Sequence, residues 1–126
     1  MPEQCKEFYS LTANQQEKAF PTYSLEKQLV LHRCGMDLRP PITTYSICIA
    51  EHEPAIPLLL DGLESEKNEL TQYAIIDIFE VMSVKGYLRN RSDVVSRIHQ
   101  VVARMKIPTF KEMAQKDLDE IEKNSR

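Results

Sequence analysis

A helical hairpin between residues 54 and 84 is the clearest pattern of apolar and polar positions in the chain. Its first half is strongly apolar, with Ile56, Leu58, Leu59, Leu60 and Leu63. In its second half, apolar residues at three- and four-residue spacing share one helical face: Leu70, Ala74, Ile75, Ile78, Phe79 and Met82. The charged run 64–69 cannot join a core and predicts a short turn. We therefore expect two antiparallel helices, with Pro57 in the first turn of the first helix.

A second hairpin is predicted over residues 92–123. Its first helix, with Ser92 or Asp93 as the expected N-cap, carries an unbroken apolar stripe: Val94, Val95, Ile98, Val101, Val102 and Met105. Pro108 then interrupts the pattern. A last helix is expected from about residue 109 to residue 123, with its buried positions at Phe110, Met113, Ala114, Leu118 and Ile121.

The N-terminal region predicts a further hairpin over residues 24–53, broken at Arg39-Pro40-Pro41 because a residue before proline avoids the helical conformation. Its first helix is expected to have Ser24 as N-cap and to end near Gly35, with buried positions at Leu25, Leu29, Val30 and Met36. Its second helix is expected over residues 42–52. Residues 1–23 are expected to form a capping segment, with a capping box at Thr12 and Gln15.

No segment alternates apolar and polar residues over the length of a strand, so these patterns predict the all-α class. A chain of 126 residues is one domain by length. We expect a single domain over residues 1–126 with about six main helices in antiparallel hairpins.

The hairpin of residues 54–84 resembles a HEAT repeat. Such repeats open with Ala-hydrophobic-Pro-x-Leu, which stands here as Ala55-Ile56-Pro57-Leu58-Leu59, and continue through an acidic turn into a second helix of small and aliphatic residues. The match departs from the repeat pattern at Gln72. The resemblance implies a HEAT/armadillo-like right-handed α-α superhelix. It also implies a binding face made by the second helices, which here correspond to residues 72–84 and 111–123.

Charge is distributed unevenly along the chain. Residues 51–82 carry eight acidic residues against Lys67, whereas residues 85–106 carry six basic residues against Asp93. Two interpretations remain open: solvated faces of the molecule that attract each other, or a bipolar surface that docks a charged protein partner. The candidate interaction residues are Arg89, Arg91, Arg97, Arg104, Asp77, Glu80 and Tyr73. A net charge of −3 and the lack of aromatic residues among the basic ones argue against a nucleic-acid partner.

The three cysteines, Cys5, Cys34 and Cys48, are an odd number, which suits free thiols in a reducing compartment. An exported protein would suit one disulfide, for which Cys34–Cys48 is the candidate. Together with His32 and His52, Cys34 and Cys48 are also candidate zinc ligands. Because His32 and Cys34 would point in nearly opposite directions on a helix, we favour cysteines that are buried as small apolar side chains.

The chain has no run of eighteen apolar residues, so we expect no membrane partner. Its first residues, MPEQCKEF, do not resemble a signal peptide, which favours a soluble cytoplasmic protein; an exported protein whose leader has been removed is the alternative.

No catalytic motif is present, and we expect neither enzymatic activity nor a cofactor. The favoured hypothesis is a protein-interaction or scaffold module, for which self-association is one option. The alternatives are a metal- or small-molecule-binding protein that uses His32, Cys34, Cys48 and His52, and an exported structural domain with one disulfide.

Overall fold

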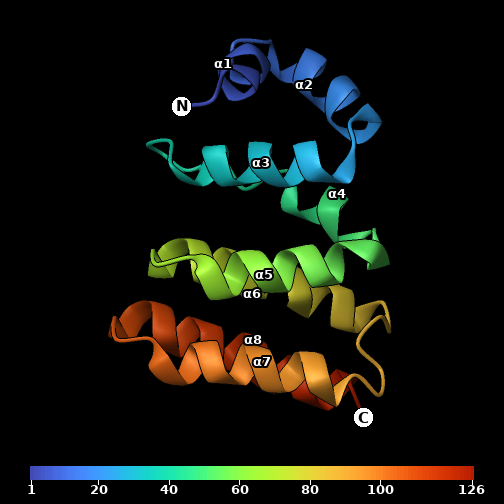
Figure 1. Ribbon diagram of the computed structural model, residues 1–126, viewed down its shortest axis with the longest axis vertical. Helices are drawn as coiled ribbons and strands as arrows, with labels where there is room; N and C mark the ends of the chain where they lie inside the picture. The colour runs from blue at the N-terminus through green and yellow to red at the C-terminus, as the bar shows by residue number, and fades with distance from the viewer. The chain divides into compact units, whose positions relative to one another are not determined.

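The computed structural model describes all residues from 1 to 126 and contains eight α-helices, two short 3-10 helices and no strand (Figure 1). The predicted all-α class is confirmed, whereas the predicted number of about six main helices is too low. One additional helix, α1 (Glu3–Tyr9), lies in a segment whose pattern alone did not predict it. The chain divides into two compact units, Met1–Ile49 and Ala50–Arg126, which we call the N-terminal and C-terminal units. The expectation of a single domain stays a prediction.

The N-terminal unit is built from short helices with well-formed ends. Helix α1 is followed by α2 (Ala13–Ala19), the 3-10 helix η1 (Phe20–Thr22) and α3 (Leu25–Met36). The predicted capping box of α2 is confirmed, because the side chains of Thr12 and Gln15 each accept a hydrogen bond from the other residue's backbone N–H. Ser24 caps α3 as predicted, by accepting a hydrogen bond from the N–H of Lys27.

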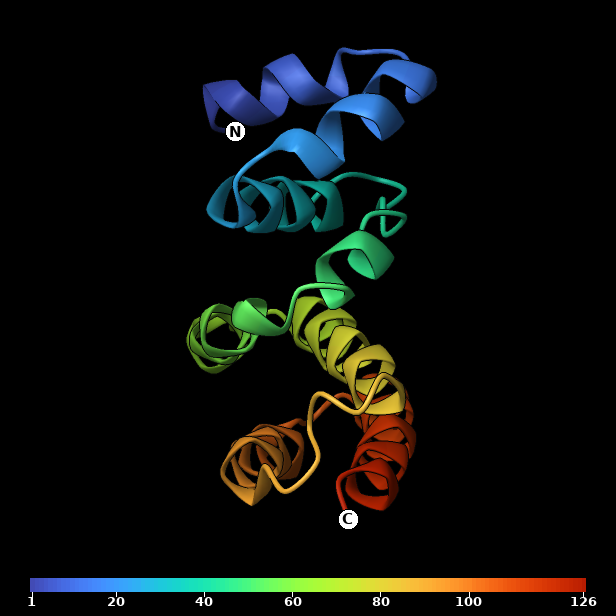
Figure 2. The same ribbon diagram turned by 90° about the vertical axis from the view of Figure 1, so that its right-hand side faces the viewer.

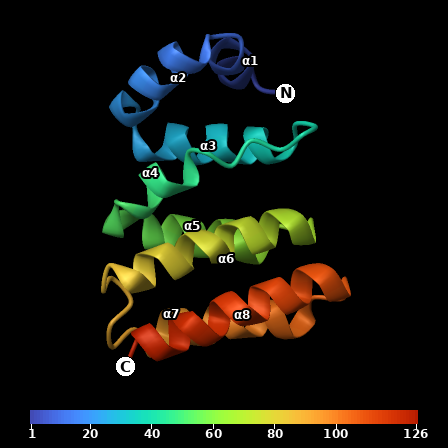
Figure 3. The ribbon, with the colours of Figure 1, turned by 180° about the vertical axis from the view of Figure 1, so that it is seen from behind.

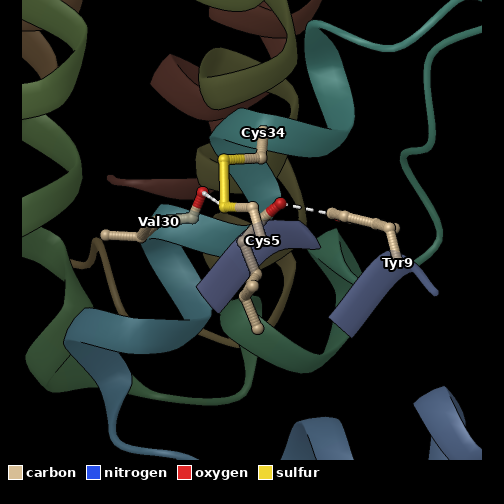
Figure 4. The surroundings of a disulfide bond; sticks show 5 residues. Cys5, Tyr9, Val30 and Cys34 are labelled. Carbon is tan, nitrogen blue, oxygen red and sulfur yellow. Dashed lines mark hydrogen bonds between the residues drawn. A yellow bond between two sulfur atoms is a disulfide. The ribbon is translucent and has the colours of Figure 1, made fainter. Parts of the chain in front are cut away.

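A disulfide joins α1 to α3. Cys5 and Cys34 are both buried and are bonded to each other, with their Cα atoms 6.4 Å apart (Figure 4). Beside this bond, the Tyr9 hydroxyl donates a hydrogen bond of 2.6 Å to the carbonyl oxygen of Leu31. The predicted Cys34–Cys48 pairing is therefore wrong. Cys48 is half-buried in α4 (Ser46–Ala50) and lies outside the disulfide.

An aromatic cluster surrounds Phe8 of α1. The ring of Phe8 lies 5.9 Å from that of Phe20, 6.0 Å from that of Tyr23 and 5.5 Å from that of Tyr45, measured between centroids. Phe20 and Tyr45 stack with their centroids 4.5 Å apart. The Tyr45 hydroxyl also donates a 2.8 Å hydrogen bond to the side-chain oxygen of Gln16. These contacts hold α1, α2 and the segment before α4 against one another.

Helix α3 buries a different face from the one predicted. Leu25, Leu29 and Val30 are only half-buried, and Met36 is buried as expected. The buried residues also include Gln28, Leu31, His32, Cys34 and Gly35. The disulfide and the Tyr9 hydrogen bond place α1 against the side of α3 that carries Leu31 and Cys34. Because α3 is apolar on more than one side, its own pattern did not show which side α1 covers.

Gly35 allows a close approach of the chain to α3. A Cβ atom at this position would lie 2.6 Å from the Tyr9 hydroxyl oxygen and 2.8 Å from the carbonyl oxygen of Ile42. The carbonyl oxygen of Gly35 accepts a hydrogen bond from the N–H of Ile42 at 2.9 Å. Gly35 was expected near the end of the helix, and α3 ends at the next residue, Met36. The glycine is needed here for space.

The helix predicted over residues 42–52 is much shorter than expected. Helix α4 spans only Ser46–Ala50. The N–H of Ile42 donates to the carbonyl of Gly35 and holds this residue against α3, and the Ser46 hydroxyl donates to the carbonyl of Thr43. At the other end, His52 is extended and precedes the 3-10 helix η2 (Glu53–Ala55). The predicted second helix of this region is therefore reduced to little more than one turn.

The C-terminal unit contains two long helical hairpins. The first consists of α5 (Ile56–Ser65) and α6 (Glu69–Val84), and the second of α7 (Ser92–Arg104) and α8 (Pro108–Asn124). These bounds agree with the helices predicted within residues 54–84 and 92–123, and Pro57 lies in the first turn of α5 as expected. Asn68 caps α6 through its side-chain oxygen. The predicted cap of α7 is wrong, because its N-cap is Arg91 and has no side-chain cap.

Equivalent helices of the two hairpins run parallel. At the start of α6, the Glu69 carboxylate accepts hydrogen bonds from the N–H groups of Lys106 and Ile107, just before α8 begins. At the far end, the Asn124 side chain of α8 donates to the Ser83 hydroxyl of α6 at 3.2 Å. Helices α6 and α8 therefore lie side by side, with α5 and α7 forming the other layer of this unit (Figures 2 and 3).

The predicted buried positions of these hairpins are largely correct. All predicted positions of α6 are buried except the half-buried Leu70, and all those of residues 92–105 except the half-buried Val95. In α8, Phe110 and Met113 are half-buried, whereas Ala114, Leu118 and Ile121 are fully enclosed. Leu58 of α5 is partly exposed, at 37%.

Candidate interaction surface on helices α6 and α8

Acidic side chains from two helices meet where α6 lies against α8. Asp77 and Glu80 come from α6, and Asp117 and Glu120 come from α8. Asp77 and Glu80 raise the pKa of Asp117, and Asp77 and Glu120 raise the pKa of Glu80. We call these four residues the acidic cluster. Because carboxylates repel one another at short range, their proximity is unfavourable for the folded chain at neutral pH.

Burial and the neighbouring charges make Asp117 a weak acid. Burial is the larger cause, and the negative charges of Asp77 and Glu80 add to it, so the pKa of Asp117 rises to about 7. A proton on Asp117 would also allow a hydrogen bond to Asp77. The pKa of Glu80 is raised for the same two reasons. Basic side chains are absent from the causes of both shifts, so carboxylates dominate the charge around Asp117 and Glu80.

Tyr73 lies next to the acidic cluster, one turn before Asp77 on α6. Its pKa is raised by burial first and then by the charges of Asp77, Asp117 and Glu80. Tyr73, Asp77 and Glu80 were all candidate interaction residues, and the structure brings these three together. All three are half-buried.

Asp117 and Glu120 were missed in the sequence analysis. Asp117 follows Ala114 by three residues and precedes Ile121 by four, so it occupies a position of the apolar stripe of α8. An acidic residue inside such a stripe is a detectable signal. The pattern of α8 alone could not show that Asp77 is a neighbour, because only the parallel packing of α6 and α8 places Asp117 beside Asp77.

The candidate basic residues do not gather with the acidic cluster. The guanidinium of Arg97 in α7 donates two hydrogen bonds to the two carboxylate oxygens of Glu64. It also forms an ion pair with Asp61 at 3.6 Å, and both contacts join α7 to α5. Arg91 pairs with Asp93 at 3.2 Å. Arg89 is exposed in the segment between α6 and α7. Arg104 lines a cavity near the end of α7. Arg97 therefore takes part in an attraction between oppositely charged helix faces of the chain itself, which is the first of the two interpretations of the charge distribution.

The four candidate metal ligands do not form a site. Cys34 is bonded to Cys5, which removes its thiolate, and His32 is buried on α3. His52 is exposed. No group of three or more histidine, cysteine or acidic side chains in residues 1–126 is arranged to hold a metal ion.

Burial of His32 lowers its pKa to about 4, so this imidazole is neutral at physiological pH. Its Nε2 atom and the Oε1 atom of Gln28, one turn earlier on the same helix, are both buried without a hydrogen-bond partner.

None of the helices combines the length and the apolar character that crossing a bilayer requires. Comparisons with models of protein families, with curated proteins and with solved structures find no match for this chain.

Proposed function

We propose that the chain is a protein-interaction module whose α6/α8 face binds a basic segment of a partner protein. The observation that supports this most directly is the acidic cluster, in which neighbouring carboxylates of α6 and α8 raise the pKa of Asp117 and Glu80, so that their proximity is costly without a bound cation. A lysine or arginine of a partner placed over Asp77 and Asp117 would relieve this repulsion. Tyr73 at the edge of the cluster adds an aromatic ring on which a basic side chain can pack.

The stacking of the two hairpins supports the HEAT-like part of this proposal. In arrays of helical hairpins, each repeat buries its apolar face against the next one, and equivalent helices form continuous layers. Helices α6 and α8 are the second helices of their hairpins and form one such layer. In the proposed array, the binding face is therefore made by the second helices, and the acidic cluster lies on them.

The raised pKa of Asp117 makes the proposal testable by linkage. With a pKa of about 7, Asp117 is about half protonated at neutral pH. A bound cation favours the ionised carboxylate and lowers this pKa, so binding at pH 7 should release about half a proton per complex. Affinity should accordingly rise between pH 6 and pH 8, in a range where lysine and arginine stay charged.

Isothermal titration calorimetry with a lysine-rich peptide, acetyl-(Lys-Ala)3-amide, tests this directly. Repeating the titration in buffers of different ionisation enthalpy measures the proton release. The double variant Asp77→Asn, Asp117→Asn should weaken binding by about fivefold or more and abolish the proton release. Glu112→Gln, an exposed change on the same helix, is the matched control and should alter neither. Binding that is equal for the acetyl-(Gln-Ala)3-amide peptide, or that involves no proton release, would contradict the proposal.

The disulfide favours a second proposal, that the protein works in an oxidising compartment as an exported domain. Buried disulfides persist where the surroundings do not reduce thiols. Labelling of thiols in protein taken from its native source, before and after reduction, measures the state of Cys5 and Cys34. Complete labelling before reduction would exclude this proposal and leave the interaction module unaffected.

A further inference from the structure

The segment between α6 and α7 runs into the tripeptide Asn90-Arg91-Ser92. An asparagine followed two residues later by serine or threonine, with any residue except proline between them, is the acceptor sequence for N-linked glycosylation. Because a three-residue pattern also arises by chance, its surroundings in the structure decide whether it can serve as an acceptor. None of the other asparagines has serine or threonine at this spacing: Asn14, Asn68 and Asn124.

Asn90 lies at the surface, in a turn whose backbone is fixed. Its φ angle is 59°, in the left-handed region where asparagine is enriched. Its backbone N–H donates a hydrogen bond of 2.9 Å to the carbonyl oxygen of Ser125, just after α8. The turn is thus tied to the end of the last helix through its backbone, while the side chain of Asn90 is exposed.

The two acceptor side chains are not used by the chain itself. Ser92 is exposed like Asn90, and within residues 1–126 neither the amide of Asn90 nor the hydroxyl of Ser92 forms a hydrogen bond. Arg91, between them, pairs with Asp93 at 3.2 Å. The side chain of Asn68, by contrast, accepts two backbone hydrogen bonds and caps α6. Asn90 therefore has a free amide and room around it for a bulky group.

We propose that Asn90 is a site of N-linked glycosylation, with a lipid-linked oligosaccharide diphosphate as the donor. In the transfer, the Nδ2 atom of Asn90 forms a bond to the anomeric carbon of the first sugar. The bond between this carbon and the diphosphate oxygen breaks, and its electron pair leaves with the lipid diphosphate. Nδ2 gives up one proton to a base of the transferase. The product is an uncharged, bulky and strongly hydrated group at the surface.

The glycan depends on the proposed export of the protein, because acceptor sequences of this kind are used in secreted proteins. The Cys5–Cys34 disulfide, which lies in the other unit, independently favours the same compartment. The glycan does not depend on the proposed binding of a basic segment. Asn90 lies beyond the end of α6, whereas the acidic cluster lies within α6 and α8.

Intact mass spectrometry of protein taken from its native source, before and after treatment with peptide-N-glycosidase, tests the assignment. The untreated chain should exceed the mass of its sequence by that of a glycan. The enzyme should remove this excess and leave aspartate at position 90, which peptide mapping in heavy-oxygen water locates. An unmodified Asn90 in a chain with an intact Cys5–Cys34 disulfide would overturn the glycosylation and leave the exported domain standing. An unmodified Asn90 in a chain with reduced thiols would overturn both.

Expression of the full chain in cultured mammalian cells, behind a cleavable leader, tests the acceptor residues; cells and medium are analysed together. The parent chain and Ser92→Thr should both carry the glycan, because either hydroxyl completes the acceptor sequence. Ser92→Ala should lose the glycan completely, although Asn90 and its backbone conformation are kept. Asn14→Gln, an exposed change outside an acceptor sequence, is the matched control and should keep it. A glycan on Ser92→Ala, or a parent chain without one, would contradict the assignment.

Discussion

The two units of this chain are stabilised by different means. Helices α1, α2 and α3 of the N-terminal unit have seven to twelve residues and are joined by the Cys5–Cys34 disulfide and by an aromatic cluster around Phe8. The C-terminal unit has helices of ten to seventeen residues around an aliphatic core, with Glu69 and Arg97 linking its two hairpins. Short helices bury little apolar surface each, so they depend more on covalent and aromatic links.

This difference predicts different sensitivities for the two units. The stability of the N-terminal unit should fall on addition of reductant and on small increases in side-chain volume, because this unit depends on the disulfide and on closely packed side chains. The C-terminal unit should respond to loss of the polar contacts between hairpins, and each such loss should be smaller. Hydrogen exchange followed by mass spectrometry resolves peptides of α1, α3, α6 and α8, and it therefore measures the stability of each unit within the intact chain.

The largest effect is expected from removing the disulfide. The double variant Cys5→Ser, Cys34→Ser opens a loop with a sequence separation of 29 residues, and the loss of chain constraint corresponds to about 3.5 kcal/mol. Amide protection in α1 and α3 should fall accordingly, while that of α8 stays close to its original value. Cys48→Ser is the control, and its amide protection should equal that of the parent chain in all peptides. A uniform loss of protection in both units would show that they unfold together.

The two helical glycines should respond to alanine with opposite signs. In Gly35→Ala, the new methyl group meets the Ile42 carbonyl oxygen at 2.8 Å, and such overpacking costs about 1–3 kcal/mol. In Gly62→Ala, the methyl group meets nothing within 4 Å on helix α5, and alanine should stabilise by about 0.5–1 kcal/mol. Urea unfolding of both variants measures the two signs. A stabilising Gly35→Ala would mean that Tyr9 and residue 42 move apart freely.

Loss of the Glu69 carboxylate should have a smaller effect, confined to the C-terminal unit. Glu69 is half-buried and accepts hydrogen bonds from two backbone N–H groups at the start of α8. Glu69→Ala leaves these groups to water and should cost about 1–2 kcal/mol. Hydrogen exchange of the first turns of α8 is the measurement, with the exposed Glu112→Ala as its control. Unchanged exchange at the start of α8 would show that the contact contributes nothing to docking the hairpins.

How far the sequence predicted the structure also differs between the two units. In the C-terminal unit, long amphipathic patterns with clear breaks at Pro54 and Pro108 defined every helix to within a few residues. In the N-terminal unit, the same reasoning missed α1 and overestimated α4, because tertiary contacts decide there. The Ile42 N–H bonds to Gly35, and Cys5 reaches Cys34, and neither contact leaves a periodic signal. Only two residues of the acidic cluster, Asp77 and Glu80 of α6, were predicted from the sequence. The pattern of a single helix does not show that Asp117 and Glu120 of α8 lie beside them.

The sharpest test of the contrast is expected from pH. His32 has a folded pKa of about 4, below its unfolded value near 6.5, so its contribution to stability is complete above pH 6.5 and is lost as the pH falls through 4. Asp117 has a folded pKa of about 7, above its ordinary value of 3.8, so its contribution is complete below pH 3.8 and is lost as the pH rises through 7.

Acidification from pH 6.5 to pH 4.5 should therefore reduce amide protection in α3 and increase it in α8, after correction for intrinsic exchange. The variants His32→Gln and Asp117→Asn each remove one titrating group and should flatten the pH dependence of α3 and α8 respectively, without affecting the other helix. Because Asp117 is only half-buried, whereas His32 is buried, water weakens the repulsion between Asp117 and Asp77, and we expect the change in α8 to be the smaller of the two. Changes of the same sign in both helices would mean that other groups dominate their titration.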